Sequence, residues 1–449
     1  MGDIPIDNPY IDLWEPIEYI TDVNSIYIYE IGEKKYFFFG DQHKSKSSGG
    51  CEENFNFKCD DYNENFTNGK YYGSSCTSIG ILLHNWFTFN KDNFINTDFY
   101  LELGFIHENG RKNMEEITRE INKLKYNKSY ETKINIENIS WMELIGSIMK
   151  DCFKINKKDC SYYPSVHSHY ADVRMLANKD DIIHADPFLL FDLMDFIQNN
   201  LPRSEGKLSG LKDELSIILS IITYDYKKLL DGIISPDNFD KFINEYSNLS
   251  KSFSSNLASI YLKKIMNMKK ISVIRNGVRM HKTASELLRL TTESPYLAFL
   301  IKEFIYEKAE FYINDVKLLY DRVIDTFEYE YYGYNIYEKS MIILEALNVL
   351  LLALVPMSAL SMDAYLLARI FLQTESTEII VYAGTAHVQH YSDFFENYLA
   401  VQRLAGVDPI FNNRCLNIID LPKYLDANKY RKYVANKKYS DFINFHRRI

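Results

Sequence analysis

The sequence predicts an α/β protein with a mixed, mostly parallel sheet, built from the N- and C-terminal segments around a large helical middle region. Three observations support this prediction. Short strand-like runs occur near both ends of the chain, apolar residues recur at helical spacing between them, and two of the outer strands end in Gly-x-x-His. Strands that alternate with helices are typical of α/β sheets, whose ligand sites lie at the carboxyl ends of the strands.

The N-terminal segment shows this alternation clearly. Ser25–Glu30 alternates in polarity, a turn follows at Gly32, and Lys35–Phe39 is aromatic, so the two runs predict a β-hairpin. Thr77–Phe89 repeats apolar residues at helical spacing, and Asp98–Leu103 is a short buried-type strand. The order strand, loop, helix, strand indicates one edge of an α/β sheet.

The remainder is predominantly helical until the last strand. Residues 108–158 have a helical period, Asp159–His169 is expected to be a loop, and Ile182–Ile183 is a short strand. Pro187 to about Leu372 is almost wholly helical in pattern, and Glu378–Tyr382 is an apolar strand of the buried parallel kind. We therefore predict an α/β half over 1–190, a helical region over 191–372, and a strand-helix segment over 373–449 that completes the same sheet.

Composition restricts the class of protein and its partners. Of 449 residues, 46% are hydrophobic and 25% are charged, which is ordinary for a folded chain. The net charge of -10 repels phosphate backbones and argues against nucleic acid as a partner, with the exception of the basic tail Lys423–Ile449. That tail contains interleaved tyrosines, and the favoured interpretation is an amphipathic helix whose tyrosines pack onto the protein. Its tyrosines are Tyr424, Tyr430, Tyr433 and Tyr439.

No secretory signal is expected at the N-terminus. The longest apolar run, Ala346–Met362, is short for a membrane span and is interrupted by polar residues and Pro356, so we expect a buried helix and no membrane partner. The expected location is cytoplasmic or virion-associated. Oligomeric state is not predicted.

The chain has six cysteines and no Cys-x-x-Cys pair, so a structural zinc module is disfavoured. Cys51, Cys59 and Cys76 lie in one polar loop, with Cys152 and Cys160 further along. A disulfide within that loop and reduced thiols in a cytosolic setting both remain open.

Two strand ends carry the same motif. Gly40-Asp41-Gln42-His43 follows a run of three phenylalanines, and Gly384-Thr385-Ala386-His387 follows an apolar strand. In each, a strand buries its length, the glycine is expected to permit a tight turn, and His43 or His387 then points into the crevice. Imidazole is a common metal ligand and a common general base.

A third strand end supplies a carboxylate, Glu102, which precedes Gly104. His43, Glu102 and His387 together predict an open site for a divalent metal such as Mn, Co or Zn, with Asp41 as a further or replacement ligand. Either carboxylate is also suited to orienting a histidine.

Other polar residues are weaker candidates. The pair His167 and His169, followed by Asp172 and Arg174, suits an anion clamp or a metal site, but packing is the favoured interpretation. His390 lies one helical turn after His387, and His184 with Asp186 stands near another strand end. The signatures of a phosphate-binding loop, a serine-hydrolase elbow and a zincin helix are missing.

These motifs resemble those of the TraB/PrgY and Tiki proteins and, more remotely, the erythromycin-esterase-like and ChaN-like proteins. The resemblance lies in FFFGDQH, YLELGF and IIVYAGTAHVQHY, short islands that occur in the family's order. It implies metal-dependent hydrolysis, with His43, Glu102 and His387 at the matched positions. Where the family has an Arg-Asn segment before the last strand, this chain has Asp363 and Arg369. Rich use of residues with AT-rich codons suggests a large DNA virus as the source.

The leading hypothesis is a metal-dependent, peptidase-like hydrolase acting on a peptide or small molecule. In it His43 and His387 bind the metal or act as base, Glu102 completes the site, and Arg174 or Arg369 stabilises developing negative charge. One alternative is a non-enzymatic virion structural or packaging protein on the same scaffold. The other is an esterase-like hydrolase that uses a histidine base without metal.

Overall fold

The computed structural model divides the chain into two compact units. Unit 1 contains Met1–Leu103, Arg111–Tyr170 and Thr374–Ile449, and unit 2 contains Gly104–Gly110 and Ala171–Gln373. The structure describes residues 16–42, 75–106, 145, 163–177, 182–200, 204–237, 239–252, 256–329, 334–372, 374–409 and 415–446. His43, four of the six cysteines and nearly all of the segment predicted to be helical over 108–158 lie outside these residues.

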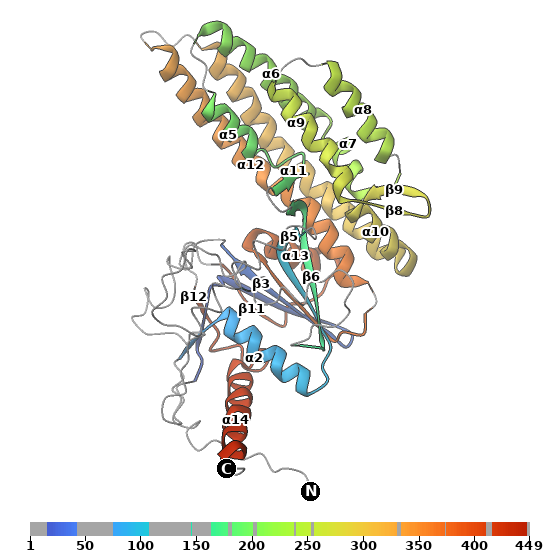
Figure 1. Ribbon diagram of the computed structural model, residues 1–449, viewed down its shortest axis with the longest axis vertical. Coiled ribbons are helices and arrows are strands. Elements are labelled where there is room, and N and C mark those ends of the chain that lie inside the picture. Colours follow the sequence, from blue (N-terminus) through green and yellow to red (C-terminus); the bar gives the residue numbers. More distant parts are fainter. Residues whose placement is uncertain are drawn as a thin grey trace. The chain divides into compact units, whose positions relative to one another are not determined.

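Unit 1 holds most of the main sheet and three of the helices that pack on it (Figure 1). Its elements are β1 (Tyr19–Thr21), β2 (Ser25–Ile31), β3 (Lys34–Asp41), β4 (Cys76–Ser78), α2 (Ile79–Asp92), β5 (Thr97–Ile106), β10 (Glu378–Gly384), α13 (Thr385–Asp393), the π-helical turn η6 (Phe394–Tyr398), β11 (Ala405–Val407), β12 (Cys415–Asn417) and α14 (Ala427–His446). The strand β6 (Val166–Ala177) begins in unit 1.

The main sheet joins the two ends of the chain, as predicted. Its strand order is β11-β2-β3-β10-β5-β6-β7, so the C-terminal strand β10 lies between two N-terminal strands. β10 is parallel to both β3 and β5, whereas β2 and β3 form the predicted antiparallel hairpin. Gly32 occupies a positive φ of 61° in the hairpin turn, which glycine adopts without a steric penalty. The predicted α/β class with a mixed sheet is confirmed.

Both faces of the sheet are covered in unit 1. Alternate strand residues such as Phe37 and Ile380 face α2, where Trp86 is fully buried and contacts the Phe37 ring edge-on at 4.7 Å. The other face carries Phe38, whose ring meets Phe395 of η6 at 5.1 Å. Because successive strand residues point to opposite faces, the run of phenylalanines supplies both layers of the core.

The basic tail forms α14, and its tyrosines pack onto unit 1. The Tyr430 ring stacks on Trp86 with centroids 5.1 Å apart, and the Tyr433 hydroxyl donates to Asp92 at 2.8 Å. For these two tyrosines the predicted packed helix is confirmed.

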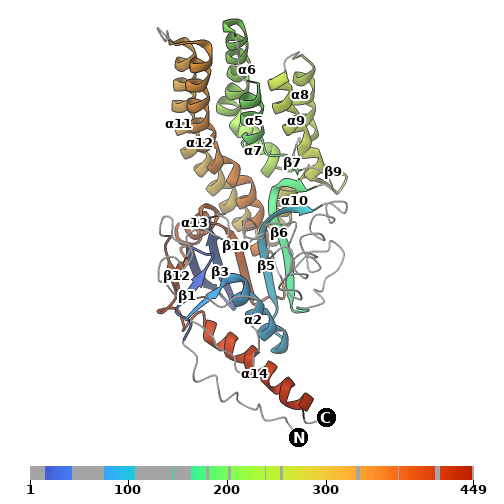
Figure 2. The same cartoon turned by 60° about the vertical axis from the view of Figure 1, so that its left-hand side comes forward.

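Unit 2 is mainly helical (Figure 2). Its elements are the end of β6, β7 (Ile182–His184), α5 (Phe191–Asn199), α6 (Glu205–Tyr224), α7 (Tyr226–Ile234), α8 (Phe239–Ser252), α9 (Asn256–Asn267), the 3-10 turn η5 (Met268–Ile271), β8 (Ser272–Arg275), β9 (Val278–His281), α10 (Lys282–Glu293), α11 (Pro295–Glu328) and α12 (Ile336–Phe371).

Two local predictions were wrong. The segment expected to be a loop up to His169 already forms β6 from Val166, because its polar residues His167 and His169 find a partner, Asp98, on the neighbouring strand β5. The helical middle is interrupted by the hairpin β8–β9, whose turn residues Asn276 and Gly277 have φ angles of 52° and 77°. Asn-Gly is the preferred pair for such a turn, so the sequence did contain the signal.

The apolar run Ala346–Met362 lies inside α12. Residues from Met357 onward are buried, as expected. In the first half only one face is buried, by Leu347, Leu350, Leu351 and Leu354, whereas Val349 and Leu352 are 49% and 55% exposed. Within the described part of the chain, α12 is long and apolar enough to cross a membrane by length and composition, and 44% of its most apolar window is buried. Core helices of soluble proteins meet the same criterion.

His281 makes the stability of unit 2 depend on pH. Its ring ends β9 and caps α10, with Nδ1 accepting the Thr283 N–H at 3.2 Å. Burial, with a smaller contribution from Lys282, lowers the pKa of His281 from 6.5 to about 3. The unfolded chain therefore binds one more proton than the folded chain between these pH values, and stability is lost as the pH falls through this window.

We expect the free energy of unfolding to drop by about 1.4 kcal/mol per pH unit from this group between pH 6 and 5. His281→Asn is the matched variant, since asparagine also caps a helix but does not titrate. Urea unfolding of both proteins at the two pH values measures the difference. Equal losses in the wild type and the variant would show that His281 does not titrate on unfolding.

Candidate functional site

The predicted site lies where the parallel strands β3 and β10 end beside β5. In the register of the sheet, Gly384 of β10 lies beside Asp41 of β3, and Tyr382 lies beside Leu101, the residue before Glu102 in β5. Glu102 does not end its strand as predicted, because β5 continues to Ile106. The last residues of β3 and β10 nevertheless meet at one edge of the sheet beside Glu102. The chain folds this way because all three strands are apolar along their length.

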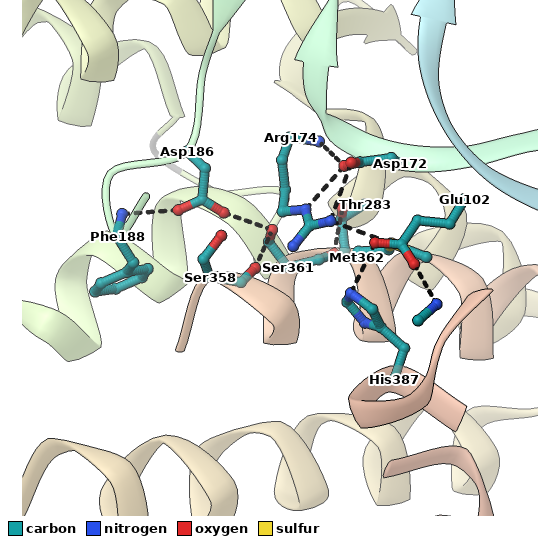
Figure 3. Close-up of polar contacts among 11 residues, drawn as sticks. Glu102, Asp172, Arg174, Asp186, Phe188, Thr283, Ser358, Ser361, Met362 and His387 are labelled. Atoms are coloured by element: carbon teal, nitrogen blue, oxygen red, sulfur yellow. Dashed lines mark hydrogen bonds and ion pairs between the residues drawn. The ribbon is translucent and has the colours of Figure 1, made fainter. Parts of the chain in front are cut away.

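Glu102 and His387 form a direct pair at this edge (Figure 3). Glu102 Oε1 lies 3.2 Å from His387 Nε2, and Glu102 Oε2 accepts the Gly384 backbone N–H at 2.5 Å. The side chains are 7% and 6% exposed. One carboxylate thus binds both the last residue of β10 and the histidine one helical turn later, which fixes the imidazole against the sheet edge.

The first turn of α13 is tied to the N-terminal strands by Thr385. Its hydroxyl lies 2.5 Å from Asn24 Oδ1 and 3.1 Å from the Asp41 carbonyl oxygen. Asn24 in turn donates its backbone N–H to the Gly40 carbonyl at 2.9 Å. The sequence analysis did not identify a role for Asn24 and Thr385, because no motif or spacing near either residue indicates one. Only the pairing of β10 with β3 brings the two residues together.

Gly40 is required for a different reason from the one predicted. It lies inside β3 rather than in a turn, and Gly384 has an ordinary φ of -57°. A Cβ atom on Gly40 would stand 2.1 Å from Ser25 Oγ and 3.2 Å from Thr385 Cα. The absence of a side chain therefore allows α13, and with it His387, to approach the sheet closely.

Gly40→Ala is expected to destabilise the protein by about 1–3 kcal/mol, because the added methyl group overpacks a contact with backbone that can give only slightly. Urea unfolding measures the loss. The matched variant is Gly210→Ala in α6, where nothing lies within 4 Å of the new Cβ. It should be neutral or stabilising by up to about 1 kcal/mol; equal behaviour of the two variants would contradict the close approach.

The Glu102–His387 pair could supply two of the ligands that a metal site needs. Two ligands bound to one ion at about 2 Å each lie within about 4 Å of one another, which the Glu102–His387 separation of 3.2 Å satisfies. Gln42 Oε1, beside the same edge, is buried without a hydrogen-bond partner among the described residues. Three His, Cys, Asp or Glu side chains do not gather as a metal centre within the described residues. The donor set fits a metal only if His43 joins it.

The two predicted arginines lie in unit 2, and each contacts a carboxylate there. Arg174 binds Asp172 through two parallel contacts, Nε to Oδ1 at 2.9 Å and Nη2 to Oδ2 at 3.0 Å (Figure 3). Arg369 lies 3.2 Å from Glu286. Burial raises the pKa of Asp186, whose carboxylate accepts hydrogen bonds from the Phe188 N–H and the Ser361 hydroxyl.

The expected group of His167, His169, Asp172 and Arg174 is divided. Both histidines contact Asp98 Oδ1 instead, at 3.3 Å and 3.4 Å, and the His169 ring stacks on Tyr100. Burial alone would raise the pKa of Asp98, but the histidine hydrogen bonds outweigh it and hold that pKa below its ordinary value. Asp98 is the second residue of β5 and lies four residues before Glu102, so this cluster lies nearer the N-terminal end of that strand than Glu102 does. His390 is buried on α13.

Comparisons with models of protein families, with curated proteins and with solved structures find no match for this chain. The resemblance of its motifs to the TraB and Tiki proteins therefore stays a prediction.

Proposed function

We propose that the chain is a hydrolase whose catalytic centre is the Glu102–His387 pair. The observation that carries this proposal is the nearly buried carboxylate that contacts both His387 Nε2 and the backbone at the junction of β10 and α13. A carboxylate that fixes an imidazole at a strand edge is the arrangement required of a histidine that moves protons or binds a metal.

In the leading version, His43, Glu102 and His387 hold a divalent ion such as Mn, Co or Zn, with Asp41 beside them. Such an ion, when bound, acidifies water at neutral pH and polarises a carbonyl. Glu102 then completes the site, and its contact with His387 also fixes the position of that ring. Peptide bonds are the substrate class that the motif resemblance implies, and this class is part of the proposal.

A second version needs no metal. The direct contact of 3.2 Å between Glu102 Oε1 and His387 Nε2 favours it, because an ionised carboxylate only accepts hydrogen bonds and so places the imidazole proton on Nε2. The basic lone pair then resides on Nδ1, from which His387 would take a proton from water during ester hydrolysis.

Elemental analysis of purified wild type beside His43→Ala/His387→Ala tests these versions, together with a screen of peptide and ester substrates. Stoichiometric metal that is lost in the double variant supports the first. Metal-free protein that hydrolyses esters and loses this activity in His387→Ala supports the second. The control is His167→Ala, which changes a histidine of β6 that contacts Asp98 and not Glu102. Inert, metal-free protein after incubation with Mn or Co would contradict both versions and favour a virion scaffold.

The cysteines bear on where such an enzyme works. Cys76 and Cys415 are both disulfide-bonded. Disulfides persist in oxidising settings, so we favour virion association over the cytoplasm within this proposal. Both thiols should resist alkylation until a reductant is added, as mass spectrometry of the alkylated protein would show. Labelling of both without reductant would support the cytoplasmic alternative.

A further inference from the structure

Asp186 is a buried acid in the connection from β7 to α5 of unit 2, in contact with α12 (Figure 3). It is 1% exposed, and two serines on one turn of α12, Ser358 and Ser361, are 0% and 2% exposed. The carboxyl group makes two polar contacts. Its Oδ1 accepts the Phe188 N–H at 2.7 Å, and its Oδ2 lies 2.8 Å from Ser361 Oγ.

The contacts of Ser361 indicate which group holds a proton. Its hydroxyl oxygen lies 2.8 Å from Asp186 Oδ2 and 3.0 Å from the Ser358 carbonyl oxygen. A carbonyl oxygen and an ionised carboxylate only accept hydrogen bonds, and a hydroxyl has a single proton to donate. If Asp186 is ionised, one proton therefore has to serve two acceptors. If Asp186 is protonated, it donates to Ser361 Oγ, Ser361 donates to the Ser358 carbonyl, and each contact has its own proton.

The number of donors also favours a neutral acid. An ionised carboxylate offers about four sites to donors, and burying its charge is costly unless they are filled. Asp186 has at most two donors among the described residues, the Phe188 N–H and the Ser361 hydroxyl. The Ser358 hydroxyl, one turn before Ser361, is buried and has no hydrogen-bond partner within the described part of the chain. A further donor close in sequence to Ser361 is thus not used for Asp186.

Two cations on other elements, Arg174 of β6 and Lys264 of α9, attract a negative charge on Asp186. Both form their hydrogen bonds with other oxygen atoms. Arg174 makes two parallel contacts with Asp172, at 2.9 Å and 3.0 Å, and Lys264 Nζ donates to the Leu189 carbonyl. They therefore act on Asp186 by electrostatic attraction, without a hydrogen bond to it.

The balance of these effects favours the protonated form. Burial is the largest effect, and it raises the pKa of Asp186. The opposing effects are weaker together, and they come from the Phe188 N–H, Arg174, Ser361 and Lys264. Tyr261 of α9 is a further titratable group that interacts with Asp186; burial raises the pKa of Tyr261, so its hydroxyl is uncharged.

We propose that Asp186 is a pH-sensitive switch in unit 2. It is protonated at neutral pH and donates to Ser361, which holds the connection from β7 to α5 against α12. At higher pH it ionises, and this hydrogen bond is lost. The proposal does not depend on the proposed hydrolase activity, because its tests measure protonation and unfolding.

The sign of the pH dependence follows from the proton count. An aspartate in the unfolded chain ionises near pH 4, as judged from its ordinary pKa of about 3.9. Above that pH the folded chain binds one proton more than the unfolded chain. Stability from this group is therefore lost as the pH rises, until the folded acid ionises as well.

Asp186→Asn tests the switch, since an asparagine amide can donate to Ser361 and accept the Phe188 N–H but cannot ionise. Between pH 6 and 7 the unfolding constant of the wild type should rise about tenfold relative to that of the variant, as measured by urea unfolding. His281 contributes equally in both proteins. A ratio of unfolding constants that stays the same at the two pH values would overturn the proposal.

Asp172→Asn is the matched control. Asp172 is also a buried aspartate of unit 2, but its carboxylate binds the Arg174 guanidinium. The same substitution should therefore raise the unfolding constant at both pH values, with no tenfold change relative to the wild type between them. If Asp186→Asn behaves in the same way as Asp172→Asn, Asp186 is a charged residue and not a switch.

Carboxyl ¹³C NMR of the wild type does not depend on a variant that folds. In protein labelled at the aspartate Cγ atoms, one resonance should keep the chemical shift of a protonated acid at pH 7, whereas ordinary aspartates titrate near pH 4. This resonance should be missing from the spectrum of Asp186→Asn. If every aspartate has reached its ionised shift by pH 6, or if the retained resonance persists in the variant, the proposal is wrong.

Discussion

Glu102→Gln is expected to lower the rate constant for hydrolysis by roughly 10²–10⁴-fold, the range over which a positioned acid-base group contributes. Glutamine has nearly the same shape, and its amide oxygen can still accept the Gly384 N–H. It lacks the negative charge that faces His387 Nε2 at 3.2 Å. The loss should therefore appear in kcat, on the substrate that the screen identifies, while the free energy of unfolding changes little.

His387→Ala should cause a loss of similar size, and the double variant should be hardly worse than either single variant. Residues that act as one unit give strongly non-additive effects. His390→Ala is the matched control, since His390 lies one turn along α13 and is also buried. Additive losses, or a rate unchanged in Glu102→Gln, would place the catalytic centre elsewhere.

The strands that build this site could be predicted because the local sequence of each is enough to identify it as a strand. Lys35–Phe39 and Glu378–Tyr382 are too apolar to be anything but buried strands, and both fall within the observed β3 and β10. Two strands that end in the same motif then imply a shared edge. The Glu102–His387 contact follows from that topology, although 285 residues separate the two in sequence.

What could not be predicted depends on partners distant in sequence. His167 and His169 were predicted to lie in a loop because their segment is polar. In the structure both contact Asp98 on the adjacent strand, a partner that their own segment cannot indicate. Asn24 gains its role at the site only through Thr385. Such residues carry no periodicity of their own, so a pattern within one segment cannot reveal them.

Asp172→Asn is expected to destabilise the protein by about 3–5 kcal/mol, the usual cost of breaking a buried ion pair. Asp172 and Arg174 are 1% and 9% exposed, and Asp172 also accepts the Arg174 backbone N–H at 2.9 Å. Asparagine retains one acceptor but removes the negative charge that binds the Arg174 guanidinium through two parallel contacts, in a place that water hardly reaches. Urea unfolding, followed by far-UV circular dichroism, measures the loss.

The double variant Asp172→Leu/Arg174→Met separates two explanations of that loss. If the cost of Asp172→Asn is a buried guanidinium that has lost its bidentate carboxylate, removing both charges should recover most of the stability, because apolar side chains need no counter-ion. If the pair contributes large net attraction, the double variant should instead be at least as unstable as Asp172→Asn. Lys227→Gln, which breaks an exposed pair with Glu310, should cause no measurable change, since solvent already screens it. Recovery in the double variant would identify Arg174 as a residue whose charge Asp172 neutralises for folding, and would leave the Glu102–His387 pair as the one to which hydrolysis is to be assigned.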